Sequence, residues 1–234
     1  MAKKPRTPPP PRRVQAPQAR SRDAGREGRP LWLLIAVGAA VLAAAAAGVF
    51  LFAFGGSASA GESIRGAGCT LEIVPVEYPE DADGAPLRHV DELPEGFEYP
   101  TDPPVAGPHH NVQSPLDVYD EPVEQLRLVH NMEHGAVVIQ YGEDVPEADV
   151  RRIVEWYRAD PNGLLIAPLP RLGDQISLGA WRAHFGADNR LEREEGVLAK
   201  CPRFDEQAFD AFLDEYGFQG PEGATRDQLP PGGG

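Results

Sequence analysis

Apolar residues after position 68 recur with two spacings, and each spacing predicts one kind of element. Alternation, or a short continuous apolar run, is typical of a strand inside a domain, whereas repeats at three and four residues indicate a helix with one buried side. Strands are predicted at 69–78, 135–141, 163–170 and 175–186, and helices at 146–160 and 205–217. The pattern therefore predicts an α+β domain with a small mixed or antiparallel sheet and two main helices.

The segment 31–54 differs from these elements because it is apolar on every side. Its 24 residues carry no charge, and as a helix they span about 36 Å, enough to cross a bilayer core of about 30 Å. Residues 1–30 carry nine Lys or Arg and two acidic residues, which predicts a disordered tail that stays in the cytoplasm. We expect a single-pass protein of the cell membrane, anchored through 31–54, with its C-terminal domain extracytoplasmic.

Composition sets the remaining boundaries. We expect a linker at 55–68, one compact extracytoplasmic domain at 69–222 and a disordered tail rich in Gly and Pro at 223–234. Ala58 and Ala60 fit the small-x-small pattern of a signal peptidase site, so cleavage near Ala60 stays open. The length of the apolar segment favours a retained anchor.

The net charge narrows the range of partners. The chain carries −14 at pH 7, and because residues 1–30 carry +7, the remainder carries −21. Nucleic acid needs a basic patch, which such a surface does not offer, so we expect no nucleic-acid partner. Cations suit this surface better.

The two cysteines, Cys69 and Cys201, both follow the predicted membrane segment. An even count in an oxidising compartment indicates one disulfide. Such a bond would link the first predicted strand covalently to the start of the last predicted helix. The sequence contains no C-x-x-C motif, so a thioredoxin-like redox role has no support.

Histidines are concentrated in two short motifs, "PPVAGPHHN" and "VHNMEHG". On a helical turn His130 and His134 lie about 5 to 6 Å apart at Cβ, with Glu133 beside them. On a strand they would stand about 13 Å apart. The turn suits joint ligation of a zinc or copper ion, with Gly135 ending the turn and Met132 pointing into the core. We predict a metal site at His109, His130, Glu133 and His134, with His89 and His110 as further candidate ligands.

The motifs "YPTDPPVAGPHH", "VHNMEHGAVVIQY", "LGAWRAHF" and "FDEQAFDAFLDEYGFQGPE", in this order, resemble a bacterial extracytoplasmic family known as domain of unknown function 3105. The resemblance covers about residues 69–222. It implies a membrane-anchored or secreted domain whose recurring polar residues correspond to His89, His109, His130, Glu133 and His134. It implies no established activity.

Three classes of function are compatible with these residues. The first is an extracytoplasmic domain that binds zinc or copper through the His and Glu cluster. The second is a metal-dependent hydrolase with Glu133 as general base, since H-x-x-E-H is also the inverted zinc-peptidase signature, although that signature needs a long helix and Gly135 ends one here. The third is a cell-surface scaffold or interaction domain in which the histidines are structural. We expect His184 to have a structural role in any case, and Trp156 and Trp181 to be packing residues.

Overall fold

The computed structural model describes residues 59–233. The predicted cytoplasmic tail, the predicted membrane helix and the first residues of the predicted linker lie outside the described residues and stay predictions. Among the helices of residues 59–233, none combines the length and the apolar character that crossing a bilayer requires.

Five strands form one mixed sheet in the described part of the chain. They are β1 (Thr70–Pro75), β2 (Val137–Tyr141), β3 (Leu164–Pro168), β4 (Ile176–Phe185) and β5 (Leu191–Cys201). The spatial order is β1-β5-β4-β2-β3. All neighbours are antiparallel except β2 and β3, which are parallel. The predicted α+β class and the mixed sheet are confirmed.

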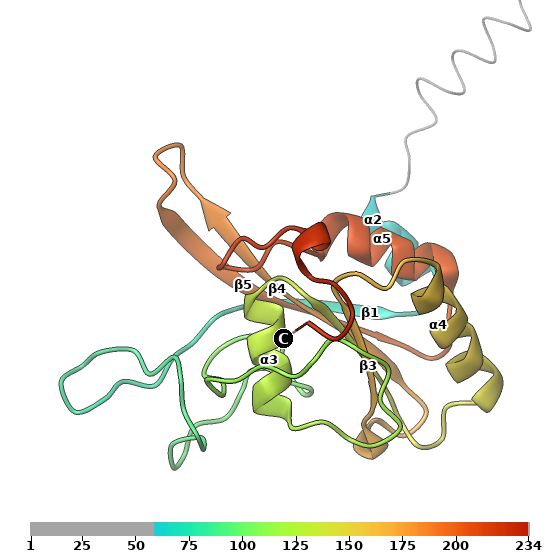
Figure 1. Cartoon of the computed structure of the whole chain (residues 1–234), viewed down its shortest axis with the longest axis horizontal. Coiled ribbons are helices and arrows are strands. Elements are labelled where there is room, and N and C mark those ends of the chain that lie inside the picture. The colour runs from blue at the N-terminus through green and yellow to red at the C-terminus, as the bar shows by residue number, and fades with distance from the viewer. Residues whose placement is uncertain (1–58, 234) are drawn as a thin grey trace, which may run out of the picture. The chain divides into compact units, whose positions relative to one another are not determined.

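Strand β5 was not predicted from the pattern of the sequence. Its first residues are charged and exposed, and only its second half is buried. The reason is visible in Figure 1, where the ends of β4 and β5 form a hairpin that projects from the rest of the sheet. A strand that is half solvated and half buried does not keep one alternation along its whole length.

Four α-helices accompany the sheet in residues 59–233, two more than predicted. The two predicted helices are α4 (Glu147–Ala159) and α5 (Glu206–Tyr216). Helix α3 (Gln125–Glu133) extends the single helical turn expected around His130. Helix α2 (Ala60–Gly66) lies in the segment expected to be a linker, because Ser59 and Glu62 form a capping box and Ile64 is buried.

Side chains of each strand point alternately to the two faces of the sheet, and both faces are covered. On one face Ile139 and Val197 pack under α2, α4 and α5. On the other face Val138 and Leu198 pack under α3 and parts of the long connection between β1 and α3. Figure 1 shows α2 and α5 side by side above the sheet and α3 separate from them. The histidine motifs therefore lie on the α3 side.

The C-terminal segment is packed against the domain and is not a disordered tail, so that expectation was wrong. Leu229 is buried, and its carbonyl accepts a hydrogen bond of 2.7 Å from the backbone N–H of Gly163. Arg226 forms an ion pair of 2.9 Å with Asp160. Composition suggested disorder because Gly and Pro are frequent, but one apolar anchor and one ion pair suffice to hold so short a segment.

The predicted disulfide between Cys69 and Cys201 is confirmed. It closes a loop with a sequence separation of 132 residues, and such a cross-link stabilises a domain by about 4 to 5 kcal/mol on the chain-entropy model. Its expected place at the start of the last helix was wrong. Cys201 is the last residue of β5, and because Thr70 pairs with Lys200, the disulfide joins β1 and β5 where their pairing ends.

Glu195 on β5 is surrounded by cationic partners. Its Oε2 accepts hydrogen bonds from Arg182 Nη2 at 2.7 Å and from His184 Nε2 at 3.0 Å, and Arg193 lies 3.3 Å from its Oε1. Burial by itself raises the pKa of Glu195, but the hydrogen bonds from His184 and Arg182 outweigh it and lower the pKa below its usual value. His184 thus has the structural contacts expected of it.

We predict that Glu195→Gln lowers the free energy of unfolding by about 1.5 to 3 kcal/mol at neutral pH. A carboxylate whose pKa is lowered by folding stabilises the protein above its unfolded pKa of about 4.3, and that stabilisation is lost as the pH falls through the folded pKa. The cost should therefore be full at pH 7 and shrink in acid, as measured by urea unfolding. Glu192→Gln, an exposed position on the same strand, is the control and should change little. A cost that persists undiminished in strong acid would contradict the prediction.

Candidate metal centre

Helix α3 presents two histidines on one turn. His130 lies in its last turn and His134 is its C-cap, and their rings stack with centroids 4.8 Å apart and planes inclined by 15°. The helix ends there because Gly135 has φ +102°, a conformation that favours glycine, and lies against the backbone of Gly220. The expected helical turn and its stop at Gly135 are confirmed. Met132 is 1% exposed and points into the core, as expected.

The loop that carries His109 rests directly on the sheet. Val105 packs against two strand glycines, Gly179 on β4 and Gly196 on β5, and a Cβ at these positions would lie 2.9 and 2.8 Å from its methyl groups. A side chain on either strand would push the loop away. The close approach leaves His109 fully buried, edge-on to the ring of Trp181 at 5.7 Å between centroids.

A second extended segment brings His89 to the same place. His89 and His109 form an isolated parallel bridge, in which His109 N–H donates to the carbonyl of Arg88 and Val90 N–H donates to that of His109, both at 2.8 Å. The rings of His89 and His109 lie edge to face at 4.7 Å, and the ring of His89 lies 5.7 Å from that of His130. His89 is exposed, so it forms the solvent side of the cluster.

Two of the histidines are oriented by hydrogen bonds of Nδ1, and a third has a carboxylate beside the same atom. His109 Nδ1 lies 2.8 Å from the carbonyl oxygen of Gly107, and His130 Nδ1 lies 2.6 Å from that of His110. His134 Nδ1 lies 3.2 Å from a carboxylate oxygen of Glu222. The two carbonyl oxygens can only accept, so Nδ1 carries the proton in His109 and in His130. In a neutral ring the lone pair is then on Nε2.

The Nε2 atoms of these rings lie close to one another or to a carboxylate. His130 Nε2 and His134 Nε2 are 2.9 Å apart. His109 Nε2 is 3.0 Å from Glu133 Oε2, yet both atoms are buried and neither has a hydrogen bond of good geometry. The His130 and His134 nitrogens can share one proton, whereas the His109 nitrogen and the Glu133 oxygen need a cation or a proton between them. A transition-metal ion with imidazole and carboxylate ligands meets this need.

The electrostatics of the cluster favour an ionised Glu133 and a neutral His130. Burial by itself raises the pKa of Glu133, but the contact with His109 and the fields of His130 and His89 outweigh it, so the pKa is lowered. Burial lowers the pKa of His130, helped by His109 and His134. A neutral imidazole and an ionised carboxylate are the forms that bind metal.

Two overlapping groups of side chains have potential ligand atoms within 4.8 Å of one another. One is His89, His109 and His130, and the other is His130, Glu133 and His134. All four residues predicted as ligands thus lie in the cluster, as does His89, but they are divided between two groups that share His130. The ring of His110 turns toward Val112 and Asp91, and its contribution to the cluster is its backbone carbonyl.

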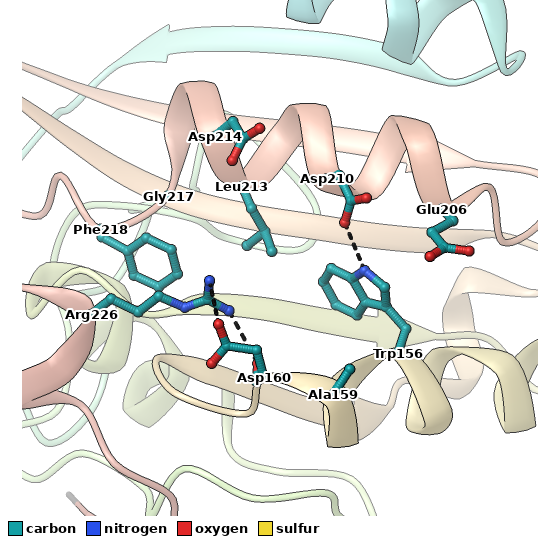
Figure 2. A pocket seen from close by; sticks show the side chains of 10 residues that line it. All are labelled: Trp156, Ala159, Asp160, Glu206, Asp210, Leu213, Asp214, Gly217, Phe218 and Arg226. Atoms are coloured by element: carbon teal, nitrogen blue, oxygen red, sulfur yellow. Dashed lines mark hydrogen bonds and ion pairs between the residues drawn. The ribbon is translucent and has the colours of Figure 1, made fainter.

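A cavity of about 650 Å³ lies on the other side of the sheet, between α4 and α5. Figure 2 shows Trp156 of α4 reaching across to Asp210 of α5, with a hydrogen bond of 2.9 Å from its indole N–H. Arg226 lies on the ring of Phe218 and pairs with Asp160. The polar groups of Trp156 and Arg226 are satisfied by these partners, in contrast to His109 and Glu133. The histidine cluster is therefore the better candidate for a functional site.

The fold and the cluster together define a class of protein. It is an α+β domain with one internal disulfide, in which histidine and carboxylate groups lie between α3 and two extended segments. A family model described as "Protein of unknown function (DUF3105)" matches residues 89–228, and the chain belongs to this family. The matched region begins at His89 and contains every residue of the cluster. Comparison with curated proteins and with solved structures gave no match.

Some positioning residues were not found from the sequence. Glu222, which holds His134, lies 88 positions later in a segment with no local signal. Gly179 and Gly196 did carry a signal, because a glycine inside a strand often marks a close approach of another backbone. What the sequence could not show is that Val105 is the residue that makes this approach.

We predict that Gly196→Ala lowers stability by about 1 to 3 kcal/mol, the usual cost of overpacking, because its methyl group would lie 2.8 Å from Val105 Cγ2. Val105→Ala removes that atom, so the double variant should lose less than the sum of the two single changes. Denaturant unfolding of the four proteins measures this coupling. Gly66→Ala is the control, because a Cβ there has no neighbour within 4 Å. Additive losses would show that Val105 does not rest on this glycine.

Proposed function

We propose that this protein is a membrane-anchored extracytoplasmic domain that binds one transition-metal ion, zinc or copper, through its His and Glu cluster. The observation that carries the proposal is the orientation of His109 and His130 by hydrogen bonds from Nδ1 to two backbone carbonyls, with His134 Nδ1 3.2 Å from the carboxylate of Glu222. Metal-binding histidines commonly donate their second ring N–H to such oxygens, which fixes the tautomer and directs the other nitrogen to the ion. A purely structural histidine has no need to leave Nε2 unpaired in the interior, as His109 does.

Charge supports the same proposal. Glu133 is 5% exposed, and a buried carboxylate is costly unless a cation or hydrogen-bond donors compensate it. Neutral imidazoles alone do not supply that charge, whereas a zinc or copper ion does. The acidic surface predicted for the region after the membrane segment favours the approach of cations from solution.

The hydrolase alternative receives less support. A general base must reach a water molecule or a substrate, whereas Glu133 is buried and directed at His109. Helix α3 also ends at Glu133, so the H-x-x-E-H residues do not lie within one continuous helix. We infer that Glu133 acts as a ligand or as the group that orients an imidazole.

We predict that the purified protein binds about one equivalent of zinc or copper after chelation and reloading. An ion at 100-fold its Kd should stabilise the fold by about 2.7 kcal/mol, seen as a rise in melting temperature. His130→Ala should abolish both effects, because His130 belongs to both ligand groups. His184→Ala, a histidine outside the cluster, is the control and should bind as the parent does. If the parent takes up no metal and its melting curve is unchanged, the metal proposal fails.

The anchoring part of the proposal rests on the sequence, with its charge of +7 before an uncharged stretch of 24 residues. We predict that protease added to intact cells removes the C-terminal domain and leaves residues 1–30 protected. Immunoblots with tags at either end distinguish the fragments. Protection of the C-terminal domain in intact cells, with digestion only after lysis, would overturn this orientation.

A further inference from the structure

His130 belongs to both groups of potential ligands, and this sharing has a chemical consequence. We propose that the cluster offers two alternative positions for a single ion and that the ion passes between them, with His130 as the ligand common to both. The first, the three-histidine position, consists of His89, His109 and His130. The second, the carboxylate position, consists of His130, Glu133 and His134. This inference rests on the metal-binding function proposed above.

The two positions exclude each other because His130 has one free nitrogen. Its Nδ1 donates to the carbonyl of His110 at 2.6 Å, so only the Nε2 lone pair is available. One lone pair binds one ion, and a second ion would have to do without this ligand. The cluster therefore holds one ion at a time, although five side chains surround it.

The path between the positions is short and continuous. Centroid to centroid, the ring of His130 lies 5.0 Å from that of His109 and 4.8 Å from that of His134. Glu133 contacts His109 across the boundary, with 3.0 Å between Oε2 and Nε2. The carboxylate thus borders the three-histidine position and belongs to the other, so the ion does not have to leave the protein in order to move.

The two positions differ in charge and exposure, which gives the movement a direction. The three-histidine position has only neutral ligands and includes the exposed His89. The carboxylate position includes buried Glu133, and a second carboxylate, that of Glu222, lies behind His134 at 3.2 Å from its Nδ1. A divalent ion is stabilised more by the carboxylate position, whereas exchange with solvent or with a partner is easier at His89. This is the arrangement of a domain that accepts an ion at His89 and holds it more firmly at Glu133.

The test uses Co²⁺, whose visible absorption reports its ligands and geometry, with the full-length protein in detergent. We expect one Co²⁺ per parent molecule. His89→Ala and His134→Ala should each still bind one Co²⁺, with spectra that differ from each other. Because the carboxylate position is the more stable one, loss of the three-histidine position in His89→Ala should weaken binding by less than about twofold, and His134→Ala should weaken it more. The double variant His89→Ala/His134→Ala lacks one ligand in each position, so its affinity for Co²⁺ should fall by roughly 100-fold or more. Loss of a group that only supports a metal ligand already costs up to about 100-fold.

Glu133→Gln supplies an independent readout. It should shift the spectrum of the parent toward that of His134→Ala, because the three-histidine position then predominates. Circular dichroism and thermal unfolding without metal check that each variant is folded, which we expect since His89 is exposed and His134 partly exposed. Two ions in the parent, or loss of all binding in either folded single variant, would overturn the two-position inference and leave metal binding itself intact. Failure of the parent to bind zinc, copper or Co²⁺ would instead remove the proposed function.

Discussion

A carboxylate taken out of water must be compensated, and this constraint on Glu133 governs the arrangement around the candidate site. The carboxylate lies at the end of α3, 5% exposed, and faces His109 from a different segment of the chain. Three imidazoles lower its pKa against the effect of burial. The cost of burying this charge is offset only if the rings stay in place, and so the loops that carry them must be held firmly.

The scaffold meets that requirement through close backbone contacts. Glycines on β4 and β5 let Val105 lie on the sheet, and the loop that follows carries His109 into the interior. At the other end of α3, Gly135 and Gly220 approach so closely that a Cβ at Gly220 would lie 2.2 Å from the carbonyl of Glu133. These contacts bring three separate segments to one place. They do so without adding a polar group that would compete for the histidine nitrogens.

The C-terminal segment is part of the same arrangement. It begins where Gly220 meets the end of α3, supplies Glu222 to His134, and is secured further on by Leu229 and Arg226. The disulfide at the ends of β1 and β5 stabilises the opposite part of the sheet. The cluster is thus surrounded by elements that are each fixed by a different interaction, which suits a site whose ligands must be oriented before an ion arrives.

Local patterns were sufficient for the elements and for the chemistry of α3. The period of apolar residues predicted α4, α5 and four of the strands, and the spacing of His130 and His134 predicted a shared helical turn, because these properties depend on neighbours within a few residues. Cys69 and Cys201 could be paired because no other cysteine is present. The sequence by itself therefore determined the fold class, the disulfide and the residue types of the site.

Only the tertiary structure decided how those residues are grouped. That His89 belongs with His109, that His110 contributes a carbonyl rather than its ring, and that the ligands divide around His130 all depend on loops that meet on the sheet. The same holds for the half-solvated strand β5 and for the packed C-terminal segment, whose partners lie far away along the chain. Local sequence sets the conformation of a segment, but contacts between distant segments depend on how the whole domain packs, and this packing is where the site is made.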